Sequence, residues 1–589
     1  MALSVTNRTA TAGRIVRPYN DVTTFKSVAT QDCMVTIQKT NKWTFSLTLL
    51  VAVAAATLFG GFYGNRLFGS PVQNDVQKRL KEYTDLLAAV TSWAPEDTPS
   101  DKFVYSSIDG MLRTLDPHTT FLEPKEYSDM QDRQKGSFYG LGILVTKRND
   151  QVTVITPLEG TPAARLGIRA GDVIAEVEGV STDDLSLDDV VKRLKGPKGT
   201  TVHIKIMRVG IKEPIPLTIV RAAIPTNSIS NVLMLRPGVG YIKIKDFTAT
   251  TVRELDDAVE KLKQEGMQRL VLDLRGNPGG LLDAAVGVAD HFLDKGQMIV
   301  YTKGRTTDSA QDYTAPGKHQ KLDTPLVVVV NRGSASASEI VAGAIQDHDR
   351  GLVVGETSWG KGLVQSVYTL QYGAGLALTT SKYYTPSGRN IQRDYTSFYD
   401  YYVADENEEG QANEIPLKDR KQFKTDTGRV VYGGGGITPD VIVKPAPLTK
   451  TTQLLEVRSA LFNFGVEYAA KHPEVDKDLV ITPQIVEDFI RYSAGKEVAP
   501  LDEIRQAIQK ENDRRFIERA LKAEIVAAKF GFDASYPYRL QGDNQIEKAL
   551  DVFPDAQKLA LQAADVRAHG VPGANDAGSR AAQAVPRVQ

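Results

Sequence analysis

The chain has 589 residues but only one cysteine, Cys33. A single thiol excludes an intramolecular disulfide framework, a cysteine-rich zinc site and a CxxC redox pair. The folded chain must therefore be stabilised by packing, and we expect neither a bound metal nor a cofactor.

An excess of either charge is also absent. The 71 Lys and Arg residues balance 72 Asp and Glu residues, which gives a formal net charge of −1. A chain without net positive charge has no overall electrostatic attraction to nucleic acid, so we expect no nucleic-acid partner. The sequence also lacks an internal repeat, and its length predicts roughly four domains.

One stretch is long and free of charge, from Trp43 to Tyr63. As a helix its 21 residues span about 31 Å, which matches a bilayer core. We expect a transmembrane signal anchor here, and cleavage near Ala54 remains an alternative. Residues 1–42 carry six Lys and Arg against two Asp. This excess predicts a cytoplasmic tail and a single-pass protein of the inner membrane, with residues 74 onward in the periplasm or otherwise outside the cytoplasm.

Changes of pattern along the chain predict its organisation. Apolar residues at three- and four-residue intervals predict helices, and short apolar runs between Gly, Pro and Asp turns predict strands. From Val239 onward strands and helices alternate, which is typical of an α/β layer with a largely parallel sheet. The predicted parts are a helical segment over 74–133, a β-rich domain over 134–222, an α/β core over 223–450 with a Tyr-rich acidic insertion at 395–432, a helical region over 451–565, and a disordered tail over 566–589.

A hydroxyl-rich turn follows a buried strand in PLVVVVNRGSASASEI. Ser334, Ser336 and Ser338 all compete for a catalytic role in this turn. Serine is also a preferred helix N-cap, so a purely structural role remains open.

Two further segments favour chemistry. In GETSWGKGLVQ, Lys361 lies between two glycines in an uncharged run, and Gln365 points the same way four residues later. In DLRGNPGGLL, a strand runs into a glycine-rich turn that can offer free amides to an oxyanion.

Eight motifs, in this order, resemble the carboxyl-terminal processing (tail-specific) peptidases. They are RTLDPHTTFL, GSFYGLGI, TPAARLGIRAGDVI, DLRGNPGG, RGSASASEI, GETSWGKGLVQ, YYTPSGRNIQ and GITPDV, and they cover roughly residues 74–445. The resemblance implies a serine endopeptidase with a crotonase-like (ClpP/crotonase-type) α/β core and an inserted PDZ domain, flanked by the helical N- and C-terminal regions and the transmembrane helix.

The resemblance also implies a role for each matching residue. Ser336 is then the nucleophile, Lys361 its general base and Gln365 the group that orients the lysine. The amides of Ala337 and Gly280 form the oxyanion hole. Within the glycine pair, the adjacent Gly279 is the alternative to Gly280.

The GLGI loop of the PDZ domain is then the peptide-binding site. Its residues Gly140, Leu141, Gly142 and Ile143 present amides to the terminal carboxylate of a protein substrate. The implied partners are protein substrates with exposed C-termini and the membrane, with an adaptor or a second copy of the chain left open.

Three alternatives remain at this point. A conventional triad using His348 is disfavoured, because that residue lies at the far end of the next helix, about 18 Å from Ser336. A catalytically silent PDZ scaffold is the main rival, and the retained Ser336, Lys361 and Gln365 count against it. A crotonase relative acting on thioesters lacks a nucleotide-binding feature in this sequence.

Overall fold

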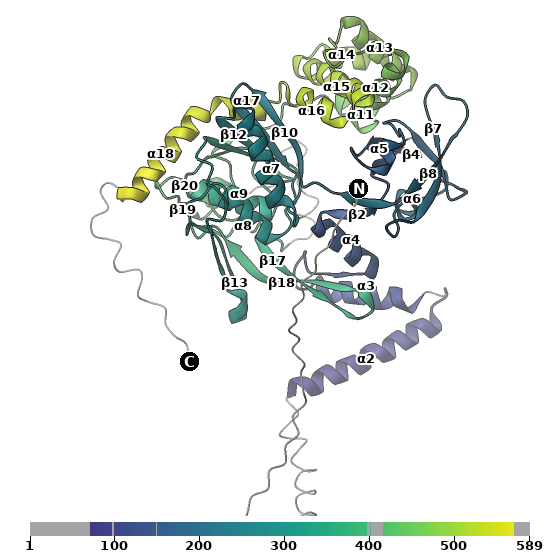
Figure 1. The fold of residues 1–589 in the computed structure, drawn as a ribbon. Helices are drawn as coiled ribbons and strands as arrows, with labels where there is room; N and C mark the ends of the chain where they lie inside the picture. The colour runs from purple at the N-terminus through teal and green to yellow at the C-terminus, as the bar shows by residue number, and fades with distance from the viewer. Residues whose placement is uncertain (1–70, 97–98, 149, 397–400, 402–415, 570–589) are drawn as a thin grey trace, which may run out of the picture. The chain divides into compact units, whose positions relative to one another are not determined.

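The computed structural model describes residues 71–96, 99–148, 150–396, 401 and 416–569. The chain divides into two compact units, residues 1–103 and 104–589 (Figure 1). The described part of the first unit holds helix α2 (Pro71–Trp93), and helix α3 (Ser100–Leu112) crosses the boundary. The sheets, domains and sites described below belong to the second unit.

The prediction of a membrane span is corrected. A span needs about 20 mainly apolar residues, and no helix in the described residues is both long and apolar enough. The longest of them, α2, carries the charged run KRLKE within its 23 residues. The predicted segment 43–63 lies outside the described residues, as does the tail 1–42. We therefore withdraw the prediction of a single-pass protein of the inner membrane with a periplasmic catalytic domain.

A six-stranded sheet forms the centre of the core. Its order is β10 (Ile229–Arg236), β11 (Val239–Ile244), β12 (Arg269–Asp273), β15 (Leu326–Val330), β16 (Leu352–Gly355) and β21 (Val441–Ile442). All neighbours are parallel except the β10–β11 pair. The central strand β15 is an uninterrupted Leu and Val run, LVVVV, because both faces of this sheet are covered.

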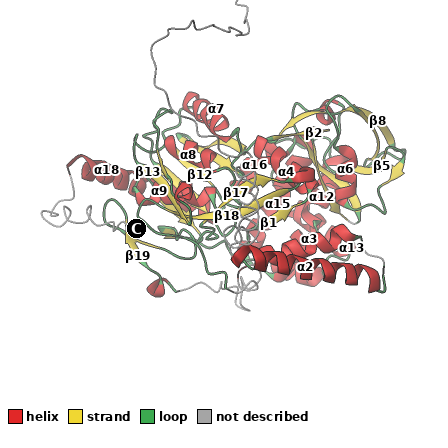
Figure 2. Ribbon diagram, turned by 90° about the horizontal axis from the view of Figure 1, so that it is seen from below, coloured by secondary structure: helices red, strands yellow, loops and turns green. Residues whose placement is uncertain are grey.

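Helices cover the two faces with separate cores. Helices α7 (Thr251–Gln264), α8 (Leu282–Asp290) and α9 (Ala337–Asp347) pack Leu255, Val288 and Ile340 against one face. Helices α17 (Asn544–Asp551) and α18 (Phe553–His569) pack Ile546, Phe553 and Leu559 against the other. Figure 2 shows α7, α8, α9 and α18 in red beside the yellow strands. The predicted α/β class is confirmed.

A second sheet carries the end of the lysine motif. Its order is β1 (Thr120–Leu122), β18 (Gly375–Tyr384), β13 (Met298–Gly304) and β14 (Asp312–Thr314), and β17 (Leu363–Thr369) also pairs with β18. Lys361 lies two residues before β17 and Gln365 lies on it.

The β-rich region forms its own sheet and core. The strand order is β3 (Ile143–Arg148), β4 (Gln151–Pro157), β5 (Val173–Val177), β7 (Thr201–Met207) and β8 (Ile215–Val220), and β6 (Val180–Ser181) pairs with β5. Helices α5 (Pro162–Arg165) and α6 (Leu187–Leu194) complete the domain. The entering strand β2 (Ser137–Gly140) pairs with the leaving strand β9 (Ala222–Pro225), so the two ends of the domain meet. This closure is what an insertion between helix α4 (Pro124–Lys135) and β10 requires.

The region after residue 450 is helical. Helices α11 (Lys450–Val457), α12 (Ala460–Lys471), α13 (Pro483–Gly495), α14 (Leu501–Ile508) and α15 (Glu511–Phe530) share a core that includes Phe464, Phe489 and Leu521. Helix α16 (Phe532–Leu540) then leads to α17 and α18. Helix α18 continues to His569, so the first four residues of the predicted tail are helical, and the remainder of the tail lies outside the described residues.

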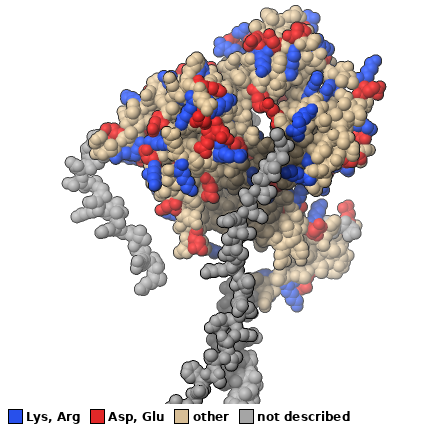
Figure 3. All heavy atoms as spheres, in the orientation of Figure 1, with Lys and Arg blue, Asp and Glu red and all other residues tan. Residues whose placement is uncertain are grey.

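In the predicted insertion at 395–432, the described residues include a short hairpin of β19 (Gln422–Lys424) and β20 (Val430–Tyr432). Most of the Tyr-rich acidic stretch lies outside the described residues. On the face drawn in Figure 3, basic and acidic side chains are interspersed, in keeping with the balanced composition.

Candidate active site

The serine-rich turn joins β15 to α9 and has an unusual backbone. Ser336 is the N-cap of α9 with φ 54° and ψ −112°. A positive φ is costly for any residue with a Cβ atom and persists only where the surroundings enforce it. A strained turn between a strand and a helix is also the arrangement that exposes a nucleophilic serine.

The three serines of the turn have different surroundings. The hydroxyl of Ser334 donates to the carbonyl of Leu274 at 2.8 Å, and that of Ser338 donates to the carbonyl of Asn277 at 2.9 Å. Both side chains are fully buried. Ser336 is half-buried and lines a cavity of about 570 Å³. Its neighbours therefore have structural roles, and Ser336 is the one of the three placed to react.

The glycine-rich turn packs directly on the serine turn. A Cβ atom on Gly279 would lie 2.7 Å from Cβ of Ser336, and one on Gly280 would lie 2.1 Å from the carbonyl oxygen of Phe247. Only glycine fits at either position.

Asn277 holds the two turns together and was missed by the sequence analysis. Its buried side chain accepts a hydrogen bond from the amide of Gly279 at 2.9 Å and donates to the carbonyl of Ile244 at 3.0 Å. Its backbone carbonyl accepts from the amide of Ala335 at 2.9 Å. The only sequence signal was an asparagine two residues before the glycine pair, which is equally typical of an ordinary turn.

Two backbone amides are placed to hold an oxyanion. Gly280 forms an isolated parallel bridge with Phe247, whose amide and carbonyl bond to Gly279 and Leu281. In that pattern the amide of Gly280 itself points away from Phe247. Gly280 and Ala337 both line the cavity with Ser336, and neither amide donates a hydrogen bond to another residue that the structure describes.

Lys361 lines the same cavity and its side chain is largely removed from water. Burial lowers the pKa of its ammonium group below the usual 10.5, and the negative charges of Glu339 and Asp116 oppose this shift without cancelling it. Nζ of Lys361 donates to the side-chain oxygen of Gln365 at 2.9 Å. A lysine with a lowered pKa that shares a cavity with a serine can act as a base.

Glu339 connects the serine turn to the lysine segment. Its fully buried carboxylate accepts hydrogen bonds from the amides of Ser336 (2.8 Å), Gly360 (2.7 Å) and Lys361 (2.9 Å) and from the hydroxyl of Ser358 (2.5 Å). Burial raises the pKa of Glu339, and these hydrogen bonds offset part of the rise. The sequence pattern did not indicate this role of Glu339, because a glutamate three positions after an N-cap serine usually indicates a capping box.

The segment before β1 supports the lysine from the opposite side. Gln365 donates through its side-chain nitrogen to the backbone carbonyl of His118. His118 contacts the hydroxyl of Tyr401 at 2.6 Å. Burial, and then the positive charge of Lys361, lower the pKa of His118 to about 4. This imidazole is therefore neutral at pH 7.

His348 has other partners. Its Nδ1 lies 2.8 Å from a carboxylate oxygen of Asp426, and its Nε2 lies 2.7 Å from the carbonyl oxygen of Met298. It does not line the cavity of Ser336. The geometry thus gives no support to a triad built on His348.

The GLGI loop lies at the start of β3. The carbonyls of Leu141 and Gly142 accept hydrogen bonds from the amides of Ala163 (3.0 Å) and Leu158 (2.8 Å). The side chain of Leu141 is in the core of the domain, and Ile143 is half-buried. Among the described strands, β3 pairs only with β4, so its other edge is open to an additional strand.

Comparison with known proteins agrees with these observations. The family model "Peptidase family S41" matches residues 238–397, and the model "PDZ domain" matches residues 130–207. These matches place the chain among the serine peptidases that carry a PDZ domain.

Curated relatives narrow the assignment. A carboxy-terminal-processing protease of Bartonella bacilliformis is 38% identical over 324 residues, covering 54% of this chain and 74% of that protein. A carboxyl-terminal-processing protease of Synechocystis is 41% identical over 295 residues, covering 49% of this chain and 68% of that protein. The protease CtpA of Bacillus subtilis is 31% identical over 351 residues, covering 59% of this chain and 74% of that protein. The chain belongs to the carboxyl-terminal processing protease family, as the sequence motifs predicted.

Proposed function

We propose that the chain is an endopeptidase that binds the C-terminal tails of protein substrates through its PDZ domain and cleaves them with a Ser336/Lys361 dyad on a crotonase-like core. The observation that carries the proposal is one cavity lined by Ser336, Lys361, Gly280 and Ala337, in which burial lowers the pKa of the lysine. These are the nucleophile, base and oxyanion donors of acyl transfer.

The reaction proceeds through an acyl-enzyme. Oγ of Ser336 attacks the carbonyl carbon of the scissile peptide bond while its proton passes to the neutral Nζ of Lys361. The amides of Gly280 and Ala337 stabilise the negative oxygen of the tetrahedral intermediate. When the C–N bond breaks, Lys361 returns the proton to the leaving amine. Water then attacks the ester with Lys361 again acting as base, which releases the acid and restores Ser336.

Gln365 orients the lysine in this scheme. Its side-chain oxygen faces Nζ of Lys361, while its nitrogen is fixed on the carbonyl of His118. The amide therefore cannot rotate without losing one of the two bonds.

Substrate selection rests on the PDZ domain. The open edge of β3 supports the addition of an extended peptide as a further strand, with the amides of residues 140–143 holding its terminal carboxylate. Because Leu141 lies in the core of the domain, it would contribute its backbone to this site, and Ile143 would contribute its side chain.

The test uses the full chain and a small reporter protein that ends in an apolar tail. We expect cleavage by the wild type and an acyl adduct on Ser336 detectable by mass spectrometry, with cleavage lost in Ser336→Ala. Binding to a fluorescent peptide with a free carboxyl terminus should persist in Ser336→Ala and should weaken at least about tenfold when the terminus is amidated. Binding by a wild type that cleaves no substrate would instead favour the silent scaffold, and equal affinity for both peptides would contradict tail recognition.

A further inference from the structure

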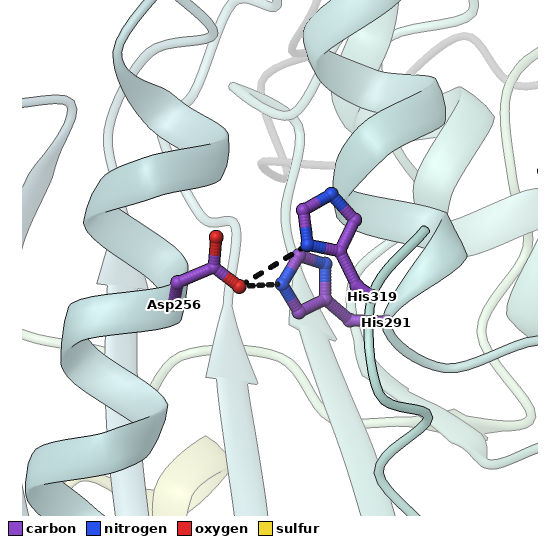
Figure 4. Close-up of side chains that lie close together, drawn as sticks. All are labelled: Asp256, His291 and His319. Carbon is purple, nitrogen blue, oxygen red and sulfur yellow. Dashed lines mark hydrogen bonds and ion pairs between the residues drawn. The ribbon is translucent and has the colours of Figure 1, made fainter. Parts of the chain in front are cut away.

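Three metal-binding side chains converge away from the candidate active site (Figure 4). Asp256 lies on α7, His291 directly follows α8, and His319 lies in the loop between β14 and β15. Nε2 of His291 is 2.8 Å, and Nδ1 of His319 is 3.2 Å, from the same carboxylate oxygen of Asp256. None of the three lines the cavity that holds Ser336.

The other nitrogen of His291 indicates how this ring is used. Its Nδ1 lies 2.8 Å from the backbone carbonyl oxygen of Gly287, which can only accept a hydrogen bond. Nδ1 therefore carries the hydrogen, and in the neutral ring the lone pair of Nε2 points at the carboxylate of Asp256. A proton or a metal ion shared by Nε2 and the carboxylate satisfies both atoms. Histidines that bind metals typically donate their second nitrogen to a carbonyl or carboxylate in this way.

The loop that carries His319 is fixed in place by a buried acid. The carboxylate of Asp290 accepts hydrogen bonds from the amides of Gly317 (2.7 Å), Lys318 (2.9 Å) and His319 (3.2 Å). Asp290 is only 1% exposed. As a result the ring of His319 stacks on that of His291, with 4.2 Å between centroids and 16° between planes. Side chains held on rigid supports in this manner form a preorganised site.

We propose that Asp256, His291 and His319 bind one divalent transition-metal ion, with Zn²⁺ as the ion that fits best. Two imidazole nitrogens and one carboxylate oxygen are ligands that zinc accepts, and they leave a fourth position for water. Calcium and magnesium instead select all-oxygen sites. Asp256 is about half exposed, at 48% of its side chain, so an ion can enter from solvent.

The bound ion would tie three separate segments together. It would link α7, the end of α8 and the loop after β14, whose three side chains already meet at one carboxylate oxygen of Asp256. No short sequence motif indicates this site, because the three ligands are 35 and 28 positions apart along the chain.

The experiment uses the full chain, stripped of metal with a chelator and titrated with Zn²⁺. We expect one equivalent to bind by calorimetry and elemental analysis, and Co²⁺ to give the visible absorption of a low-symmetry site. Asp256→Asn and His319→Ala should each weaken Zn²⁺ binding at least about tenfold. Asp256→Asn changes a partly exposed residue, so the substitution should leave the core intact. Circular dichroism checks that the variant is folded.

The matched control is His203→Ala. His203 is an exposed histidine beside a single carboxylate, Glu178, and it lacks a second imidazole in the described surroundings. This variant should bind zinc as the wild type does. Zinc should also raise the melting temperature of the wild type and of His203→Ala but not of His319→Ala. Equal zinc affinity in the wild type and in a folded Asp256→Asn/His319→Ala double variant, or equal affinity for Mg²⁺ and Zn²⁺, would overturn the proposal.

Discussion

The side-chain oxygen of Gln365 lies 2.9 Å from Nζ of Lys361 and accepts its hydrogen bond. Among the described residues the amine thus has one hydrogen-bond partner, and it is largely removed from water. That relationship determines how activity should respond to pH and to substitution at both residues.

The first prediction concerns the pH dependence of cleavage. Because burial lowers the pKa of Lys361, the neutral amine accumulates as pH rises through a value below 10.5, and kcat/KM should rise in that range. His118 cannot produce this limb, since its pKa of about 4 leaves it neutral throughout. Lys361→Ala and Lys361→Arg should each reduce kcat at least about a hundredfold, because neither supplies a base.

His348→Ala is the control for this experiment and should retain most of the activity in steady-state assays. A folded Lys361→Arg variant with normal turnover would exclude lysine as the base.

The second prediction separates orientation from charge at Gln365. Gln365→Ala should lower kcat about tenfold or more with little change in KM, because the amine loses its positioning partner. Gln365→Glu should place a negative charge beside Nζ of Lys361, raise the pKa of the lysine and shift the rising limb to higher pH. Matching pH profiles for Gln365→Glu and the wild type would show that this contact is absent during turnover.

The third prediction concerns Glu339. Its charge raises the pKa of Lys361, so Glu339→Gln should move the rising limb of activity to lower pH. The amide also replaces an acceptor by a donor facing backbone N–H groups, which should reduce the free energy of unfolding by about 1–3 kcal/mol. Urea denaturation and a pH–rate profile measure the two effects. Glu503→Gln, at an exposed position of α14, should change neither; an unshifted limb in folded Glu339→Gln would argue against the electrostatic link.

The fourth prediction tests the second face of the central sheet. Phe553→Ala removes a buried ring from the core between α18 and the sheet, and it should lower the free energy of unfolding by about 3–5 kcal/mol. Leu561→Ala, on the same helix but 65% exposed, should change it by about 0.5 kcal/mol or less. Comparable losses in both variants would mean that helix propensity rather than packing holds α18.

The sequence predicted the α/β class because buried parallel strands such as β15 consist of Val and Leu runs that are visible in the sequence. It also identified Ser336, Lys361 and Gln365 as candidates, since short motifs carry them. It left three serines in competition, because only tertiary contacts show that the hydroxyls of Ser334 and Ser338 are already engaged.

Other features could not be predicted because they depend on long-range contacts. Asn277 and Glu339 bond to segments that local pattern does not place beside them. Amphipathic spacing likewise predicted helices at 451–565, but it could not indicate that α17 and α18 would turn back onto the central sheet. The candidate metal ligands could not be predicted either, because Asp256, His291 and His319 are far apart in the sequence and meet only in the folded chain.

Helix α17 is joined to the glycine-rich turn through Arg275. This residue, just before the glycine-rich turn, donates to Asp273 at the end of β12 and to Asp543, the N-cap of α17. During synthesis the strands of the central sheet emerge long before α17 and α18, so one apolar face stays uncovered and Arg275 lacks its distant partner until Asp543 has been made. A nascent chain interrupted before residue 543 would thus have a glycine-rich turn without this support, and under the proposed function its peptidase activity would begin only after α17 has been synthesised.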